Sequence, residues 1–227
     1  MQELQRILSK VTTLTFDCYG TLIDWDAGLW SSFQALLGDR VEGRRRELFD
    51  VYVQAEAQVE AGPYRKYREV LALSSERVAE HFGMRLDAGH REFLAQQLPA
   101  WRPFADTNEA LMRLKKRFRL GVLSNIDRDL FAGTCKQFEA QFDFVVTAED
   151  VGSYKPADGH FSRLLGGHVR TQEVIHLAQS PFHDGVPARR FGIAFVWINR
   201  YNETNQTVAL PVGEFADLAS FANAVGA

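Results

Sequence analysis

The feature that most constrains the fold is an apolar run that ends abruptly in a carboxylate and a glycine turn. A Leu-Thr-Phe run at 14–16 leads into Asp17, and Gly-Thr-Leu follows at 20–22. This pattern predicts a buried strand whose carboxyl end delivers Asp17 into a tight turn. Ligands of open α/β sheets bind outside the carboxyl ends of the strands. Asp17 is therefore placed for chemistry or, like many strand-end aspartates, for capping the turn.

The composition is that of a globular chain without a nucleic-acid or membrane signature. Hydrophobic residues make up 46% of the 227 positions and charged residues 24%, which excludes disorder as the main state. A net charge of −3 argues against nucleic acid or an anionic membrane as a partner, and no apolar run approaches the ~20 residues that span a bilayer. The N-terminus lacks the apolar block of a signal peptide, and Cys18 and Cys135 lack metal-type spacing. We therefore expect a cytoplasmic protein with reduced thiols.

Periodicity divides the chain into a helical block and an alternating block. Residues 25–99 carry helical periodicity and no convincing strand. Helices are predicted there at about 29–37, 48–59, 67–82, with Ser75 capping a continuation, and 90–98. After Pro103, helices are predicted at 107–118, 161–165, 186–191 and 215–225, and strands at 120–123, 142–147, 174–178 and 194–198.

Strands that alternate with helices indicate a parallel sheet covered on both faces. The first strand, at 14–16, belongs with the later alternating block, so the helical block is an insertion behind it. We predict an α/β core formed by residues 1–22 and 101–227, and a helical cap formed by residues 23–100. An insertion at this point is placed to act as a lid over the strand ends.

Four polar clusters are predicted to meet at the strand ends. In chain order they are Asp17 with Thr21, Ser124 with Asn125, Lys155 before Pro156, and the segment 176–184 that ends in Asp184. The hydroxyl and amide of the second cluster can hold an anionic oxygen without adding charge. Read singly, the later clusters are a turn, a surface lysine and a helix cap. Four clusters in this order favour a functional site.

The sequence resembles the haloacid dehalogenase superfamily. The resemblance extends over essentially the whole chain and includes all four of these regions in order. The Asp-Cys-Tyr-Gly-Thr motif at 17–21 is most similar to the L-2-haloacid dehalogenase (type II) branch, as is Val-Trp-Ile-Asn-Arg at 196–200. The resemblance implies a Rossmann-like core with a helical cap inserted after the first strand. It also implies that Asp17 is the nucleophile and that Asp184 completes the site. The residues implied to orient or stabilise the nucleophile are Thr21, Ser124, Asn125 and Lys155.

Two positions separate dehalogenation from phosphoryl transfer. Phosphatases of the superfamily place a second aspartate two residues after the nucleophile, where this chain has Tyr19, which cannot act as a carboxylic acid. The fourth motif usually supplies a metal-binding aspartate where this chain has Gln179, whereas Mg²⁺ is usually bound by carboxylates. We therefore expect no cofactor, with a weak Mg²⁺ site at Asp17 and Asp184 as the open alternative. Tyr19 and Gln179 are assigned as substrate-binding or orienting residues.

The expected reaction is a metal-independent displacement at carbon. A carboxylate oxygen of Asp17 attacks the halogen-bearing carbon of a small 2-haloacid, and water then hydrolyses the resulting ester. A Mg²⁺-dependent phosphatase and a non-catalytic binding protein are the alternatives, and retention of Lys155 and Asp184 argues against the second of these. The expected partner is a small-molecule substrate, and the resemblance is compatible with a homodimer.

Three positions depart from the dehalogenase pattern. The branch usually has a cap arginine that meets the substrate carboxylate or the departing halide, and the candidates here are Arg65 and Arg68. A tyrosine expected shortly after the lysine is Phe161. The fourth motif reads Gln-Ser-Pro-Phe-His-Asp at 179–184. His183 is consequently a candidate for a water-activating base, a substrate contact or a structural hydrogen-bonding residue.

Overall fold

The computed structural model describes residues 2–167 and 169–227, which form two compact units. Of the described residues, the sheet unit contains 2–24, 103–125, 137–167 and 169–227, and the helical unit contains Trp25–Arg102 and Ile126–Lys136. None of the helices in the described part of the chain combines the length and apolar character that a bilayer crossing requires.

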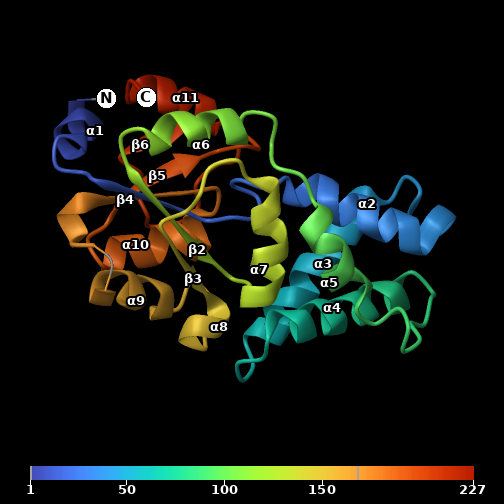
Figure 1. Ribbon diagram of the computed structural model, residues 1–227. Coiled ribbons are helices and arrows are strands. Elements are labelled where there is room, and N and C mark those ends of the chain that lie inside the picture. Colours follow the sequence, from blue (N-terminus) through green and yellow to red (C-terminus); the bar gives the residue numbers. More distant parts are fainter. Residues whose placement is uncertain (1, 168) are drawn as a thin grey trace. The chain divides into compact units, whose positions relative to one another are not determined.

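A parallel sheet forms the centre of the sheet unit, with the strand order β3-β2-β1-β4-β5-β6 (Figure 1). Its strands are β1 (Thr13–Phe16), β2 (Arg119–Ser124), β3 (Phe144–Thr147), β4 (Val174–Ala178), β5 (Ala194–Ile198) and β6 (Gly213–Phe215). Thr15 of β1 pairs with Gly121 of β2 on one side and with His176 of β4 on the other. The predicted α/β fold with a Rossmann-like parallel sheet is confirmed. The strand order reverses between β1 and β4, which is where open α/β sheets bind their ligands.

Helices cover both faces of this sheet (Figure 1). The helices on one face are α1 (Gln2–Leu8), α6 (Thr107–Lys115) and α11 (Leu218–Ala224), and those on the other are α9 (Gly159–Gly167) and α10 (Val186–Arg190), with the short α8 (Ala148–Val151) after β3. Successive side chains of a strand point to opposite faces. In β5, Val196 and Ile198 therefore join the first apolar cluster, and Phe195 and Trp197 join the second.

The helical unit is built from α2 (Trp25–Leu37), α3 (Arg45–Glu60), α4 (Tyr67–His81), α5 (Phe93–Gln97) and α7 (Arg128–Thr134). Its packing is close: a Cβ at Gly28 of α2 would lie 2.4 Å from the Trp101 ring, so only glycine fits there. The predicted interruption of α4 at Ser75 is wrong. The Ser75 hydroxyl donates to the Leu71 carbonyl at 2.6 Å within one continuous helix, which satisfies it without a new cap.

The segment 126–136 is predicted from the sequence as part of the core, whereas in the structure it clusters with the helical unit. The Asp127 carboxylate explains this, because it accepts the backbone N–H of Tyr67 at 2.8 Å and that of Arg68 at 2.9 Å. Those N–H groups belong to the first turn of α4 and have no partner inside the helix. One side chain thus joins the start of α7 to the start of α4.

The C-terminal region differs from the prediction of a helix over 215–225. Phe215 is the last residue of β6, and the helix begins only at Leu218. Asp217 sets that start, because its side chain accepts the backbone N–H of Ser220 at 2.7 Å. The short elements α1, α7 and β6 were not predicted either.

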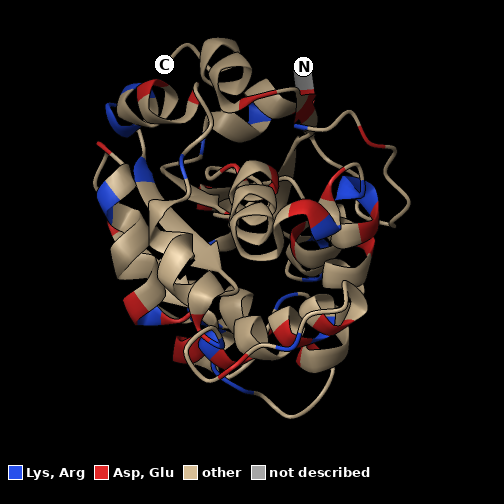
Figure 2. Cartoon of the chain, turned by 90° about the vertical axis from the view of Figure 1, so that its right-hand side faces the viewer, with Lys and Arg blue, Asp and Glu red and all other residues tan. Residues whose placement is uncertain are grey.

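Acidic and basic residues are interspersed along the helices and loops (Figure 2). Some form exposed pairs within one helix, such as Arg46 with Asp50 of α3. Exposed pairs of this kind contribute little to stability individually. The described surface thus carries mixed charge, in keeping with 26 basic and 29 acidic residues in the sequence.

Candidate active site

Asp17 directly follows β1, and the turn behind it holds its carboxylate in place. Gly20 has a φ of +88°, a left-handed conformation that favours glycine, and the N–H groups of residues 21–23 all point at the Cys18 carbonyl. This turn brings the Thr21 hydroxyl to Asp17, where it donates to Oδ2 at 2.8 Å. Asp17 is 9% exposed, so its carboxylate is oriented but not fully covered.

Lys155 supplies the positive charge at this site, from a side chain that is 1% exposed. Its Nζ donates to Asp17 Oδ1 at 2.8 Å, to Asp184 Oδ1 at 2.6 Å and to the Leu123 carbonyl at 2.8 Å, so all three of its hydrogens are used. Burial acts to lower the pKa of Lys155, but the two carboxylates outweigh burial and raise that pKa. The lysine is therefore an ammonium that contacts both carboxylates.

Asp184 lies in a helical turn, Pro181–Gly185, just beyond β4, and it is 1% exposed. Its Oδ1 accepts hydrogen bonds from Lys155 Nζ and, at 2.9 Å, from His176 Nε2. Burial acts to raise the pKa of Asp184, but the charge of Lys155 and the bond from His176 hold that pKa well below its usual range. Asp184 is consequently ionised at neutral pH.

Asn125 and Ser124, at the end of β2, have different roles. The Asn125 side chain accepts the backbone N–H of Lys155 at 2.7 Å and donates to the Lys155 carbonyl at 3.1 Å. It therefore locates the lysine backbone and makes no hydrogen bond to Asp17. Ser124 Oγ is buried and has no hydrogen-bond partner within residues 2–167 and 169–227. A buried hydroxyl left in this state is available to a ligand.

The backbone and the side chain of Gln179 both donate hydrogen bonds to residues in neighbouring loops. Its backbone N–H donates to Thr21 Oγ1 at 2.9 Å, and its side-chain Nε2 donates to Glu203 Oε2 at 2.8 Å. The first bond fixes the hydroxyl that holds Asp17, so the Gln179 backbone supports the Asp17 carboxylate through Thr21. Tyr19 is half-buried in the turn after Asp17.

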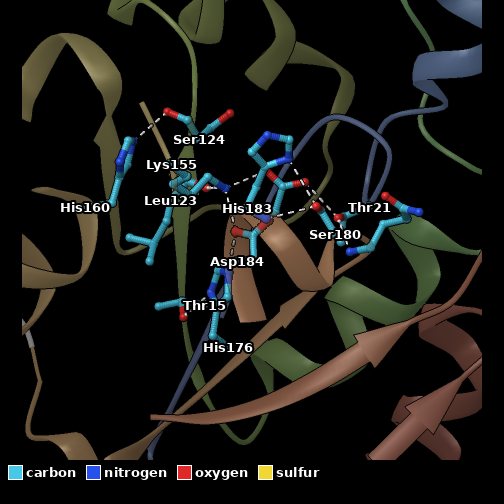
Figure 3. A network of polar contacts seen from close by, with 12 residues as sticks. Thr15, Thr21, Leu123, Ser124, Lys155, His160, His176, Ser180, His183 and Asp184 are labelled. Carbon is cyan, nitrogen blue, oxygen red and sulfur yellow. Dashed lines mark hydrogen bonds and ion pairs between the residues drawn. The ribbon is translucent and has the colours of Figure 1, made fainter. Parts of the chain in front are cut away.

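His183 precedes Asp184 and is half-buried. Its Nδ1 lies 3.1 Å from Ser180 Oγ, and the same hydroxyl accepts the His183 backbone N–H at 3.1 Å (Figure 3). Burial is the main cause that lowers the pKa of His183; the charge of Lys155 lowers it further, and the charge of Asp184 only partly opposes them. A neutral imidazole at this position has a nitrogen that can accept a proton.

Two further histidines belong to the site and were not singled out from the sequence. His160 of α9 is fully buried and bonds to the Ser124 carbonyl through Nε2 at 3.0 Å, and burial together with the charge of Lys155 lowers its pKa to about 3. His176 of β4 is fully buried between Thr15 and Asp184. The signal for His176 was present, because it interrupts an otherwise apolar strand.

The two candidate arginines are already paired inside the helical unit. Arg65 contacts Glu69 at 2.5 Å. Arg68 contacts Asp129 at 2.6 Å and Glu92 at 3.4 Å. Either guanidinium would have to exchange or share these carboxylates to bind an anionic substrate.

The donor set around Asp17 does not fit a magnesium site. Both carboxylate oxygens that face each other, Asp17 Oδ1 and Asp184 Oδ1, are bonded to the Lys155 ammonium. Mg²⁺ requires near-octahedral oxygen coordination, and the ammonium occupies the position between the two anions. In the described part of the chain, no cluster of three or more His, Cys, Asp or Glu side chains is arranged to hold a metal ion.

Comparison with known proteins agrees with this geometry. A family model for haloacid dehalogenase-like hydrolases matches residues 11–177. The (S)-2-haloacid dehalogenase of Pseudomonas fluorescens is 26% identical over 222 residues, which cover 95% of this chain and 97% of the relative. Haloacetate dehalogenase H-2 of Moraxella sp. (strain B) is 23% identical over 205 residues, covering 86% and 88%. The structure of L-2-haloacid dehalogenase from Xanthobacter autotrophicus superposes with a TM-score of 0.84 at 18% identity, covering 95% of this chain and 98% of that one. The predicted resemblance to the L-2-haloacid dehalogenase branch is confirmed.

Proposed function

The chain belongs to the haloacid dehalogenase-like hydrolase family, and from this premise we propose that it is a metal-independent dehalogenase of a small 2-haloacid. One observation carries the proposal: the Lys155 ammonium lies 2.8 Å from Asp17 Oδ1 and 2.6 Å from Asp184 Oδ1. This arrangement provides an oriented, partly exposed carboxylate with a built-in counter-charge. Such a carboxylate can act as a nucleophile without a metal to stabilise it.

In the first step a carboxylate oxygen of Asp17 attacks the carbon that carries the halogen. The new carbon–oxygen bond forms as the carbon–halogen bond breaks, and the halide leaves with the electron pair. Asp17 becomes a neutral ester, and Lys155 keeps Asp184 as its anionic partner. Ser124 Oγ supports this step as a donor for the substrate carboxylate, because it is buried without a protein partner among the described residues.

In the second step water attacks the Asp17 carboxyl carbon and the hydroxyacid leaves. The water must lose a proton, and two neighbours can accept one. Asp184 is ionised, with its Oδ2 outside the bonds from Lys155 and His176, and His183 has its pKa lowered by burial. Enclosure of this step is the role we assign to the helical unit as the cap.

The nucleophile is tested by a single turnover in H₂¹⁸O with a 2-haloacid. We expect a mass shift of one ¹⁸O in the peptide that contains Asp17, because water attacks the carboxyl carbon rather than the substrate carbon. Asp17→Asn should abolish both the ester and halide release. Asp158→Asn, which alters an exposed carboxylate paired with Arg190, is the matched control and should retain both. Label found only in the product hydroxyacid contradicts the proposal.

Metal independence is tested by a screen for halide release and phosphate release, each with Mg²⁺ and with a chelator. We expect halide release to be the same in both conditions, because Lys155 already supplies a cation beside Asp17. Phosphate release that requires Mg²⁺ favours the phosphatase alternative, although Tyr19 replaces its general acid. No turnover of either substrate class favours the binding-protein alternative.

Arg65 and Arg68 are proposed to bind the substrate carboxylate. Each already has a carboxylate partner. Replacing the arginine that binds the substrate by Ala removes a binding contact, so it should raise KM more than it lowers kcat. Equal effects on kcat and KM from both variants contradict this role.

A further inference from the structure

His176 occupies a position that the fold would ordinarily fill with an apolar side chain. Val174 and Ala178, two residues before and after it in β4, belong to the apolar cluster under α9 and α10. By the alternation of a strand, His176 faces the same side. It is nevertheless a histidine with no exposed surface. Burial of an imidazole is costly unless its nitrogens are hydrogen-bonded.

Both ring nitrogens of His176 have partners, and one of them is in the proposed active site. Nε2 lies 2.9 Å from Asp184 Oδ1, and Nδ1 lies 2.9 Å from Thr15 Oγ1. Phe161 packs edge-on against the ring with centroids 5.2 Å apart. Because an ionised carboxylate only accepts hydrogen bonds, Nε2 must carry the hydrogen of the Asp184 bond. Thr15 can serve Nδ1 as donor or as acceptor, so the ring keeps this orientation in either protonation state.

The hydrogen bond from His176 determines which Asp184 oxygen is occupied by donors from the protein. Oδ1 receives both Lys155 Nζ and His176 Nε2 (Figure 3). In the described part of the chain, both of these side-chain hydrogen bonds to Asp184 end on Oδ1 and not on Oδ2. The two donors therefore hold the carboxylate by one oxygen and leave the other available.

The hydrogen bond from His176 also helps to stabilise the negative charge of Asp184. Lys155 alone faces two carboxylates, Asp17 and Asp184. Without a second donor, Asp184 would depend entirely on an ammonium that it shares with the nucleophile. Nε2–H gives Asp184 a partner that does not change when Asp17 is esterified.

We propose that His176 is a positioning residue that holds Asp184 by Oδ1, so that Oδ2 takes the proton of the hydrolytic water. This inference rests on the proposed function and extends it to a residue that does not touch the substrate. The water oxygen bonds to the Asp17 carboxyl carbon as its proton moves to Asp184 Oδ2. The adduct then expels the hydroxyacid oxygen, which takes that proton back from Asp184, and Asp17 ionises to solvent.

The test compares His176→Leu with His176→Gln in rapid-quench single turnovers with a 2-haloacid. Leucine fills the space without a donor, whereas the glutamine side-chain amide can donate near the position of Nε2. In His176→Leu we expect ester formation within roughly twofold of the wild type and ester hydrolysis slower by roughly tenfold or more, the factor that corresponds to losing a hydrogen bond to a charged group. The ester should then accumulate. His176→Gln should recover most of the hydrolysis rate.

Two further variants separate positioning from packing. Phe161→Leu loosens the contact to the ring and keeps the Asp184 bond, so it should leave the ratio of the two rates unchanged. Thr15→Val removes the hydroxyl that partners His176 Nδ1, and it should slow ester hydrolysis less than His176→Leu does. An unchanged ratio in a folded His176→Leu variant, or a Gln variant no better than Leu, overturns the inference. If His176→Leu does not fold, the Gln and Thr15→Val ratios decide.

Failure of the proposed function is a separate outcome. It is indicated by a wild-type enzyme that forms no ester with any 2-haloacid. The His176–Asp184 contact is then tested without activity, from the melting temperatures of His176→Gln, Asp184→Asn and the double variant. Losses that are less than additive support the contact, and additive losses overturn it.

Discussion

Two carboxyl groups, one in each unit, each receive two hydrogen bonds on a single oxygen, yet their pKa values are shifted in opposite directions. In the sheet unit, Asp184 Oδ1 receives Lys155 and His176. In the helical unit, Glu56 Oε1 receives Tyr52 Oη at 3.0 Å and Tyr67 Oη at 2.7 Å. Burial raises the pKa of Glu56 by more than the two phenols lower it, whereas the pKa of Asp184 is lowered. The charge of the donors, not their number, decides whether a buried carboxyl is an anion.

This difference indicates why the proposed mechanism needs a cation at Lys155. With only hydroxyl donors like those around Glu56, burial would raise the pKa of Asp184 as it raises that of Glu56. A protonated carboxyl is neither a nucleophile nor a base. The ammonium therefore has a chemical role in addition to binding the two side chains together.

The largest expected effect comes from Lys155→Met, which leaves Asp184, like Glu56 in the helical unit, without an ammonium donor. The variant leaves two buried carboxylates without their cation, and we expect it to lose activity and about 3–5 kcal/mol of unfolding free energy at pH 7. In the wild type, the lowered pKa of Asp184 contributes stability that is present above its ordinary value, 3.8, and is lost as the pH falls through the lowered pKa. In the variant, stability should instead rise as the pH falls.

Urea unfolding at pH 7 and pH 5 measures both effects. Lys115→Met is the control, because Lys115 pairs with Asp143 near the surface, with side chains 32% and 30% exposed. It should cost less than about 1 kcal/mol. A Lys155→Met variant that follows the pH dependence of the wild type would break the comparison.

A smaller effect is expected from Glu56→Gln. The raised pKa of Glu56 means that the folded state binds this proton more tightly than the unfolded state. Its contribution is therefore present below the ordinary value, 4.5, and is lost as the pH rises through the raised pKa. Glutamine keeps an acceptor for the phenols and carries no charge. We expect a gain on the order of 1 kcal/mol, or a few degrees in Tm, at pH 7 and no gain at pH 4. An equal gain at both values would mean that ionisation is not the cause.

The smallest effect is expected from Tyr52→Phe. Tyr52 is fully buried, and phenylalanine fills the same space without the donor to Glu56. Because Tyr67 still donates to the same oxygen, we expect a loss of about 0.5 kcal/mol at pH 7, measured by chemical unfolding. A cost larger than that of Lys155→Met would reverse the assignment of importance between the two units.

The parts of the site that could be predicted from the sequence lie where an apolar run ends in a polar residue. Asp17 follows β1, Ser124 is the last residue of β2, and Asp184 lies in the turn beyond β4; a parallel sheet brings the carboxyl ends of its strands to one edge. Local chemistry was sufficient there because strand and turn are neighbours in the chain. Lys155 could be assigned from its place before a proline and from family resemblance.

The remainder depends on contacts that no local pattern contains. His176 is bonded to a carboxylate eight residues later, and only the turn after β4 brings the two together. β6 has three residues and pairs with β5 alone, so its sequence carries no alternation to detect. The helix α7 has seven residues, too few to be stable without the packing that tertiary structure provides.

The reciprocal bonds between the Asn125 side chain and the Lys155 backbone have a consequence for how the chain tolerates change. The two residues are 30 positions apart, and one carboxamide makes with the backbone the pair of bonds that a neighbouring strand would make. The entropy of closing such a loop rises only slowly with its length. Insertions at an exposed position inside it, such as after Lys136, should therefore leave the lysine correctly placed. The exposed position after Lys136, between α7 and β3, is then a place where length can vary, or new termini can be introduced, without dismantling the charge pair.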